Sequence, residues 1–459
     1  MMVEKNRKTK GFGGVEKEYF FKGFAFGVKK DNFLCSDVGF GCDCKDGTLK
    51  NGLRLKTYLT RGGLQIKQTM NRDLKKIVFF TTKNSKGNVV DRVALIGDAN
   101  EYFFLFDDEF SVPMFSSYNS EKGFSCELLW SEEDGTETYY IVSNEGLKKV
   151  QGRAERKGIV YFNKTRGGCI CKERIFLAKE NGELWYSMPL DPTDYEETVD
   201  DSGRIQLVPD GEKLIDLCAF GEYIYAFFER KILRITAAGA ARDFKVERVA
   251  YDGSQVIKGS VTVGGKCVFF LTETGVYSLA GKRAEKMDAL KIVKPLGENA
   301  FCSSAYVAGK YLLTYQTDAA GTYQTVVIDE DGEDWYYTSL MKGLTNYKGK
   351  AYAYVYHQLL EINPAGDIYP EQSGVFYVRN LRFGNGRVGL KRLRFEGVGS
   401  FSLTLKVDGK ERTYDLECSD GEAVVEVGLA GSSFALSFAL REDCELKNMT
   451  ASVEALKGA

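Results

Sequence analysis

Four stretches of the chain share one pattern and decide the fold: Gly221–Phe228 (GEYIYAFF), Gly265–Phe270 (GKCVFF), Gly309–Tyr315 (GKYLLTY) and Gly349–Tyr356 (GKAYAYVY). In each, a Gly is followed by Lys or Glu, one further residue and an apolar run of the aromatic and β-branched kind that is typical of strands. The four glycines are separated by 44, 44 and 40 residues. The sequence therefore predicts a repeated antiparallel unit.

Further strands extend this unit in both directions along the chain. Each stretch is followed by a turn and another strand: Lys231–Ile235, Gly275–Leu279, Tyr323–Ile328 and Gln358–Ile362. Weaker copies lie upstream, at Arg174–Ser187, Thr138–Val150 and Asn100–Phe106. A period of about 40 to 45 residues with four short strands is that of a β-propeller blade, which hides its apolar faces by stacking on its neighbours. We expect about seven blades, with six or eight as alternatives, and a strand near Gly23–Lys29 that completes the last blade.

Turn signals are dense and helical periodicity is scarce. Ten Asp-Gly or Asn-Gly pairs, which tolerate positive φ in tight hairpin turns, separate the apolar runs. The best helical candidate, roughly Arg283–Ala289, is short enough to be only a connector. The chain is predicted to be all-β.

The pattern changes after about residue 375. Apolar side chains alternate with polar ones at Phe401, Leu403, Leu405 and Val407, as expected for strands with one dry and one wet face. Seven strands are predicted in this part: Val375–Arg382, Lys391–Gly397, Ser400–Val407, Thr413–Glu417, Ala423–Val427, Ser433–Ala439 and Met449–Ala455. We thus expect a charged arm at 1–14, a propeller at 15–375 and a C-terminal β-sandwich at 376–459.

Composition limits the possible functions. Lys and Arg number 62 against 64 Asp and Glu, so no overall field favours nucleic acid or an anionic membrane. No run reaches the roughly 18 apolar residues of a membrane span, and residues 1–20 lack the apolar core of a signal peptide. We expect synthesis in the cytoplasm. Eleven cysteines, an odd number, indicate reduced and mostly buried thiols, with Cys218, Cys267 and Cys302 in the core.

Several motifs suggest chemistry, but each has a simpler structural explanation. Gly384–Gly389 matches G-x-G-x-x-G, yet a strand and not a helix is expected after it, which favours a hairpin over a nucleotide site. The single histidine, His357, lies in an apolar strand and is expected to be structural. Cys35, Cys42 and Cys44 and the pair Cys169 and Cys171 lack the usual zinc spacing and are expected to be buried or edge thiols.

The runs of charged residues can likewise be interpreted as functional sites or as ordinary solvated surface. The acidic runs Asp107–Glu109 and Asp329–Asp334 suggest Ca²⁺ binding or glycoside hydrolysis, but their positions at strand ends favour solvated hairpins. Two basic groups suggest phosphate contacts or, equally well, solvated surface: Lys5, Arg7, Lys8 and Lys10, and Arg387, Lys391, Arg392 and Arg394. We assign no catalytic, cofactor-binding or metal residue and expect no cofactor.

One segment resembles a known family. Glu183–Asp194 reads ELWYSMPLDPTD and contains an aromatic-Ser-x-x-x-Asp-Pro stretch, and apolar strands with an Ile-x-x-Ile unit and a strand-Gly-aromatic unit follow it. The residues concerned are Tyr186, Ser187, Asp191, Pro192, Ile232, Ile235, Gly275 and Tyr277. This order resembles the propeller-type tail hub or packaged-DNA-stabilisation proteins of short-tailed bacteriophages, over residues 130–459.

The resemblance implies a non-enzymatic subunit of a phage or prophage tail. Such a subunit attaches to the portal or connector and to other tail proteins, retains DNA without reading its sequence, and forms part of the exit channel. It can form a ring of copies on its partner. Two other hypotheses remain open. One is a propeller that binds or cleaves glycans, and the other is an intracellular protein-interaction scaffold.

Overall fold

The computed structural model describes most of the chain. The described residues are 3–456 except 7–15, 27–32, 37, 45–46, 58–73, 84–85, 98–99, 106–113, 120–123, 152–154, 198–200, 208–209, 241–242, 288–301, 320, 333, 356–357, 363–373, 385 and 442. Every named element within these ranges is a β-strand, so the chain is all-β. The same ranges contain no helix that is long and apolar enough to cross a membrane.

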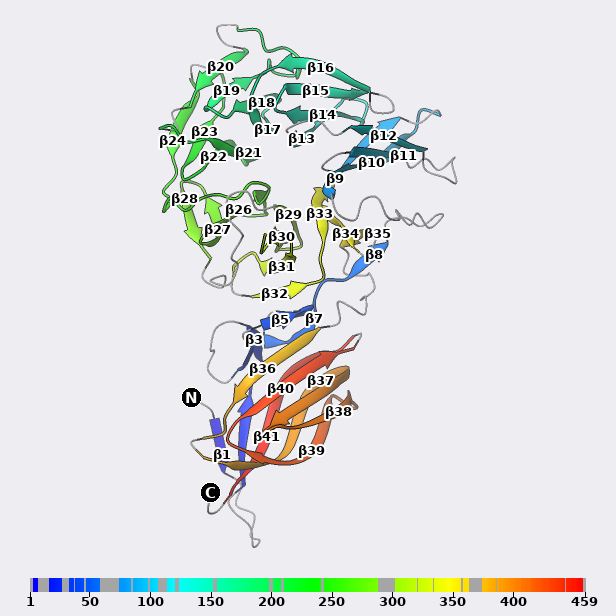
Figure 1. The fold of residues 1–459 in the computed structure, drawn as a ribbon, viewed down its shortest axis with the longest axis vertical. Helices are drawn as coiled ribbons and strands as arrows, with labels where there is room; N and C mark the ends of the chain where they lie inside the picture. Colours follow the sequence, from blue (N-terminus) through cyan, green and yellow to red (C-terminus); the bar gives the residue numbers. More distant parts are fainter. Residues whose placement is uncertain are drawn as a thin grey trace. The chain divides into compact units, whose positions relative to one another are not determined.

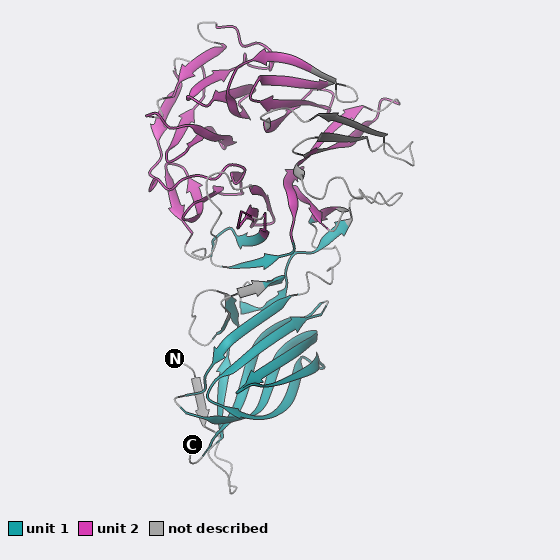
Figure 2. Cartoon of the chain, in the orientation of Figure 1, with its two compact units in different colours: residues 1–56, 325–339, 362–459 teal, residues 57–324, 340–361 magenta. Residues whose placement is uncertain are grey.

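The chain divides into two compact units (Figure 2). Unit 1 comprises residues 1–56, 325–339 and 362–459, and unit 2 comprises residues 57–324 and 340–361. This division differs from the expected arm at 1–14, propeller at 15–375 and sandwich at 376–459, because residues 1–56, 325–339 and 362–375 belong to the same unit as the C-terminal strands.

Unit 2 contains a repeated four-stranded sheet (Figure 1). Five such sheets each use four consecutive strands: β9–β12 (Leu74–Lys83, Val89–Gly97, Asn100–Leu105, Met114–Asn119), β13–β16 (Phe124–Ser131, Glu137–Ser143, Gly146–Gln151, Glu155–Tyr161), β17–β20 (Thr165–Cys171, Arg174–Lys179, Glu183–Tyr186, Gly203–Gln206), β21–β24 (Leu214–Phe220, Tyr223–Phe228, Ile232–Thr236, Lys245–Arg248) and β25–β28 (Thr262–Val263, Val268–Thr272, Gly275–Ala280, Arg283–Lys286). A sixth has the order β33 (Lys342–Tyr347), β34 (Lys350–Val355), β35 (Gln358–Ile362) and β8 (Leu55–Thr57). The hairpin β29 (Cys302–Val307) and β30 (Lys310–Gln316) lies between the fifth and the sixth in the chain.

The first strands of these repeats form a closed ring. β13 contacts β17, β17 contacts β21, β21 contacts β25, β25 contacts β29, β29 contacts β33 and β33 contacts β9, while β9 contacts β14 of the next sheet. Apolar clusters fill the space between successive sheets, such as the one that joins β17–β20 to β21–β24 through Phe176, Leu184 and Ile224. Unit 2 is therefore a β-propeller with six four-stranded sheets and with β29–β30 at a seventh position in the ring, as the repeat predicted.

The predicted repeat and the observed strands agree for the four defining stretches, which form β22, β26, β30 and β34. Three of their glycines, Gly221, Gly309 and Gly349, adopt positive φ in the preceding turn. Three expectations are corrected. The copy at Asn100–Phe106 is the third strand of its sheet, β11, because the longer β10 precedes it. The connector after Arg283 is strand β28, which pairs with β27.

The strand that completes the last sheet was also misplaced. It is β8 and not a strand at 23–29, because β3 (Phe24–Phe26) pairs in parallel with β4 (Leu34–Ser36).

Unit 1 is built around two antiparallel sheets that share a strand. One has the order β1 (Val3–Asn6), β2 (Glu16–Phe21), β41 (Glu445–Ala455), β37 (Val388–Val407) and β39 (Glu422–Gly431). The other has the order β38 (Lys410–Cys418), β37, β40 (Phe434–Leu440), β36 (Val375–Leu381) and β5 (Val38–Phe40). The short strands β6 (Cys42–Asp43) and β7 (Leu49–Asn51) pair with each other, and β31 (Tyr323–Asp329) pairs with β32 (Trp335–Thr338).

The shared strand β37 turns the corner between the two sheets at Gly397 and Gly399. A Cβ at Gly397 would lie 2.1 Å from the carbonyl oxygen of Glu445, and Gly399 has a φ of +79°, so only glycine fits this close crossing. The dry faces meet in an aromatic core of Phe24, Phe376, Phe395, Phe401 and Phe438. This is the predicted sandwich, with the expected strands at 391–397 and 400–407 joined into one.

Candidate functional site

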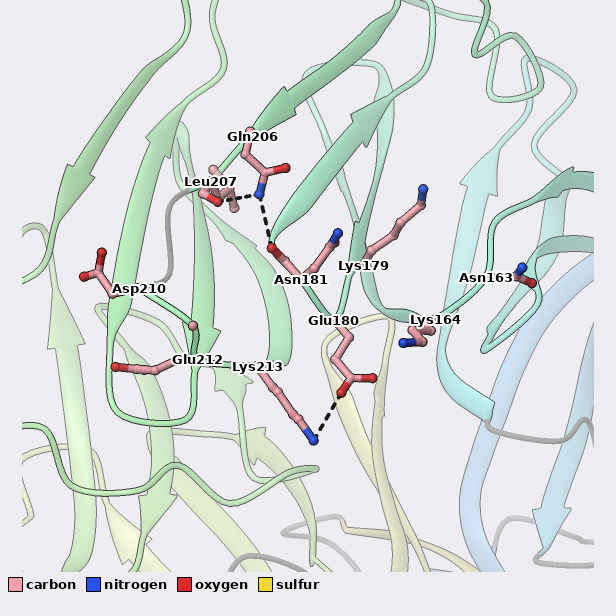
Figure 3. Close-up of a pocket in the computed structure, with 11 residues that line it drawn as sticks. Asn163, Lys164, Lys179, Glu180, Asn181, Gln206, Leu207, Asp210, Glu212 and Lys213 are labelled. Carbon is pink, nitrogen blue, oxygen red and sulfur yellow. Dashed lines mark hydrogen bonds and ion pairs between the residues drawn. The ribbon is translucent and has the colours of Figure 1, made fainter.

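A pocket of about 500 Å³ whose lining residues are mainly polar or charged lies between the sheets β17–β20 and β21–β24 (Figure 3). Three connections form its wall, those between β16 and β17, between β18 and β19 and between β20 and β21, because the turns of neighbouring sheets lie on the same face of a propeller. The residues that line it are Asn163, Lys164, Lys179, Glu180, Asn181, Gln206, Leu207, Asp210, Gly211, Glu212 and Lys213. Two of the turns carry the dipeptides Asn181-Gly182 and Asp210-Gly211 that mark tight turns in the sequence.

Backbone hydrogen bonds hold these turns together. The amide of Glu180 donates to the carbonyl of Lys164 at 2.8 Å, and the amide of Leu207 donates to the carbonyl of Gly182 at 2.9 Å. The side-chain amide of Gln206 donates to the carbonyl oxygens of Asn181 and Leu207 at 3.1 and 2.7 Å. Hydrogen bonds to main-chain carbonyl oxygens thus hold the pocket wall in place without any contribution from charged side chains.

The central carboxylate of the pocket, Glu180, is held between two cations. It pairs with Arg166 at 2.9 Å and with Lys213 at 3.3 Å. The hydrogen bond from Arg166, with help from Lys213, holds the pKa of Glu180 below its ordinary value. Glu180 is therefore ionised at neutral pH and cannot serve as a proton donor there.

The acidic edge of the pocket is also paired. Asp210 forms an ion pair with the buried Lys231, whose hydrogen bond lowers the pKa of the carboxyl group. Glu212 accepts a hydrogen bond from the backbone amide of Arg230 at 2.8 Å. These contacts order the turn before β21 and keep both carboxylates pointing to their own partners.

The basic edge leaves a cation exposed. Lys179 pairs with Glu183 at 2.6 Å and lies over the rings of Phe162 and Trp185, at 5.1 and 5.3 Å from their centroids. Lys164 is exposed, adopts a φ of +63° and makes no ion pair with any residue that the structure describes. Figure 3 shows Lys164 beside Asn163 and across the pocket from Asp210. Lys164 therefore places an exposed positive charge at this edge of the pocket.

A second group of charged residues lies on the first strands of the ring. Lys76 on β9 pairs with Glu127 on β13 at 3.1 Å, and Asp216 is on β21. Burial raises the pKa of Asp216 to about 6, against the opposing effects of the Leu217 amide, Lys258 and Lys76. The ring interior thus contains a carboxyl group that titrates close to neutral pH.

The motifs singled out in the sequence have structural roles where the structure describes them. Gly384–Gly389 links β36 to β37, so a strand follows it as expected. The two strands do not pair with each other, because β36 pairs with β40 and β5, so the predicted hairpin is wrong. Asp329–Asp334 spans the turn of the hairpin β31–β32, as predicted. His357 and Asp107–Glu109 lie outside the described residues.

The basic cluster of the sandwich is neutralised by neighbouring carboxylates. Its ion pairs are Arg387 with Asp408, Lys391 with Glu454, Arg392 with Glu426 and Arg394 with Glu422. Lys5 belongs to β1, and Arg7, Lys8 and Lys10 lie outside the described residues. The basic cluster therefore forms a paired surface of the sheet.

No disulfide joins any of the eleven cysteines. Cys169 and Cys171 lie in one apolar cluster, and Cys42 and Cys44 are also buried. Cys267 and Cys302 are in the core as predicted, whereas Cys218 and Cys35 are half-buried. Within the described ranges, no group of three or more His, Cys, Asp or Glu side chains is arranged to hold a metal ion.

The residues that carry the family resemblance lie in turns and in the apolar core of the propeller. Ser187 is fully buried, and its hydroxyl accepts a hydrogen bond from the Ile175 amide at 3.0 Å. Asp191 accepts hydrogen bonds from the amide and hydroxyl of Thr193 at 2.9 and 2.7 Å. The remaining residues with described contacts are core or network residues: Tyr186, Ile232, Ile235 and Tyr277. The sequence did not identify the pocket, since its residues come from three separate connections between strands.

No protein-family model and no curated protein matches the chain. Among solved structures it is similar to BamB from Moraxella catarrhalis, with 10% identity and a TM-score of 0.41 over 69% of this chain and 99% of that one. It is also similar to BBS1N in complex with ARL6DN, with 9% identity and a TM-score of 0.43 over 66% of this chain and 96% of that one. The Pan2 WD40 domain of Neurospora crassa is similar too, with 8% identity and a TM-score of 0.38 over 67% of this chain and 93% of that one. At these scores the three likenesses support no functional assignment.

Proposed function

We propose that this chain is a non-enzymatic structural component of a phage or prophage tail, made in the cytoplasm and then carried in the virion. It acts by attaching to a portal or connector ring and to other tail proteins, and it contributes to DNA retention and to the exit channel. The proposal starts from the resemblance of Glu183–Asp194 and the strands after it to propeller-type tail hub proteins.

One observation carries the non-enzymatic part of the proposal. The carboxylates of the pocket are paired with neighbouring cations or amides, and the pKa values of Glu180 and Asp210 are lowered. General acids need raised pKa values, so this arrangement favours recognition by a rigid surface over acid catalysis. The hydroxyl of Ser187 and the carboxylate of Asp191 are likewise engaged in hydrogen bonds with the backbone amides of Ile175 and Thr193.

The glycan hypothesis has one observation in its favour. The pocket wall contains three amide side chains, Asn163, Asn181 and Gln206, of the kind that recognise sugar hydroxyls. A scaffold of the same shape without a phage origin would use the same loop face. Genes for a portal, terminase or capsid beside the gene for this chain would favour the tail hypothesis over both.

Reconstitution tests the proposal directly. The full chain is mixed with assembled portal rings encoded by the neighbouring gene, and the mixture is analysed by native mass spectrometry and electron microscopy. We expect an annular complex with a fixed ratio of the two proteins. A chain that stays monomeric, does not bind the portal rings and binds oligosaccharides at micromolar concentration would contradict the proposal.

A further inference from the structure

A bulky apolar residue occupies a turn position that favours glycine. The backbone of Met188 pairs with that of Asp191, and the amide of Asp191 donates to the carbonyl of Met188 at 3.3 Å. Between them stand Pro189 and Leu190, and Leu190 has a φ of +62°. The third residue of a turn that begins X-Pro takes Gly or Asn when its φ is positive, because a large side chain is strained there.

The side chain of Leu190 is also 70% exposed, among the highest values for a large apolar residue in the described chain. Exposure of one leucine needs no explanation, and neither does one unusual turn. An exposed leucine with a strained backbone does need an explanation, because its side chain strains the backbone and yet buries little apolar surface in the fold. Glycine at this position would keep the same backbone hydrogen bonds without the strain.

The loop around Leu190 is held firmly in place. The amide of Leu190 donates to the carbonyl of Glu173 at 2.8 Å, and the amide of Met188 donates to the carbonyl of Asp194 at 2.9 Å. Ser187 anchors the start of the loop in the core, and Asp191 closes its end through Thr193. A strained backbone conformation persists where surrounding contacts hold it, and such conformations are frequent at recognition sites.

The surroundings of Leu190 are acidic. Glu173, whose carbonyl accepts the hydrogen bond from the Leu190 amide, has an exposed side chain, and hydrogen bonds from Thr193 lower the pKa of Asp191 and keep it ionised at neutral pH. The nearby cation Lys172 already faces Glu222 at 3.8 Å. A partner that covers this loop must therefore offer an apolar cavity for the leucine and basic groups at its edge.

We propose that Leu190 is the anchor by which this chain docks to a partner protein, inserting its side chain into an apolar pocket rimmed by Lys or Arg. This inference rests on the proposed function, since it supplies the contact through which a tail component would bind its portal. A preformed, rigid turn suits the task because little flexibility is lost when the side chain is buried by the partner.

The first test separates folding from docking. Leu190→Gly and Leu190→Asn are compared with the wild-type full chain for thermal midpoint and for affinity to the portal rings. We expect a midpoint equal to or above that of the wild type, and a loss of affinity on the order of tenfold or more. Tyr161→Ser is the matched control, because Tyr161 is 74% exposed but lies in ordinary backbone, and it should bind as the wild type does. A lowered midpoint or an unchanged affinity in the Leu190 variants overturns the proposal.

The second test does not require the portal to be the partner. A photo-crosslinking amino acid, p-benzoylphenylalanine, is placed at position 190 or at position 161, and purified particles are irradiated. We expect position 190 alone to give a product with another protein, identified by mass spectrometry. If the portal rings fail to bind but this product forms, the proposed function is wrong and the docking role of Leu190 stands. No product at position 190, or a product only with a second copy of the chain, overturns the docking role.

Discussion

The rings of Phe395 and Phe401 meet edge to face with their centroids 5.1 Å apart, although both belong to strand β37. They meet because the strand bends between them and places one ring on each sheet of the sandwich. The bend depends on Gly397, where an added Cβ would lie 2.1 Å from the carbonyl oxygen of Glu445.

The substitution Gly397→Ala should therefore destabilise unit 1. The clash is with backbone on β41, which cannot move without losing its pairing to β37, so we expect a loss of about 1–3 kcal/mol in the free energy of unfolding. Urea denaturation monitored by fluorescence measures it. Gly386→Ala is the control, since Gly386 has open space around it and no positive φ, and its stability should change little. Equal stability of the two variants would show that β37 does not bend where described.

A second prediction concerns the N-terminal segment. Phe24 is buried against Phe376 and Phe438, at centroid distances of 5.5 and 5.8 Å, so it belongs to the sandwich core. Phe24→Ala should cost about 3–5 kcal/mol. Hydrogen exchange measured by mass spectrometry should show lost protection in β36 and β40 and unchanged protection in β21–β28. Lost protection in the propeller strands instead would place Phe24 in the other unit.

The parts of the fold that could be predicted depend on local signals. The repeat was visible because each second strand follows a Gly turn and carries its own aromatic pattern, as at Gly221–Phe228 and Gly349–Tyr356. The place of residues 15–56 was not visible, because β2 reaches unit 1 only by pairing with β41 at the other end of the chain. The sequence predicts that one strand ends at Gly397 and another begins at Ser400, and it does not distinguish a bend from a turn there because both favour glycine.

The candidate site was harder to predict for the same reason. Glu180, Lys213 and Lys164 come from separate turns, and only the stacking of two sheets brings them to one pocket. Leu190 lies within the segment Glu183–Asp194 that carries the resemblance but was not singled out, and its positive φ could not be inferred because the stretch Met188–Asp191 contains no glycine.

The buried hydroxyl of Ser187 gives a third prediction. Ser187→Ala leaves the amide of Ile175 without its side-chain partner in a fully buried position, which should cost about 1–3 kcal/mol. Thr193→Ala is the control, because Thr193 is exposed and its backbone bond to Asp191 remains, so the change should stay within about 0.5 kcal/mol. Chemical denaturation of both variants makes the comparison. If Ser187→Ala proved neutral while it abolished an activity, the structural role of this residue would be contradicted.

The fourth prediction concerns pH. Burial raises the pKa of Asp216 from an ordinary value of 3.8 to about 6 in the folded chain. The folded state therefore binds this proton more tightly than the unfolded state does, so the contribution of Asp216 to stability falls as pH rises from about 4 to about 6 and is level above that. Asp216→Asn keeps an oxygen acceptor for the Leu217 amide, which donates to Asp216 at 2.8 Å, and removes the charge.

Unfolding measured between pH 4 and pH 8 should show this effect in the variant. We expect Asp216→Asn to be more stable than the wild type at pH 7, by on the order of 1–2 kcal/mol because the group is partly exposed, and to match it near pH 4. The control is Asp252→Asn. Burial raises the pKa of Asp252, but hydrogen bonds from Tyr277 and Ser254 outweigh it and leave the pKa lowered, so this substitution should reduce stability at pH 7. A change in stability of the same sign in both variants at pH 7 would contradict the raised pKa of Asp216. The removal of one negative charge, whatever its position, would then explain both changes.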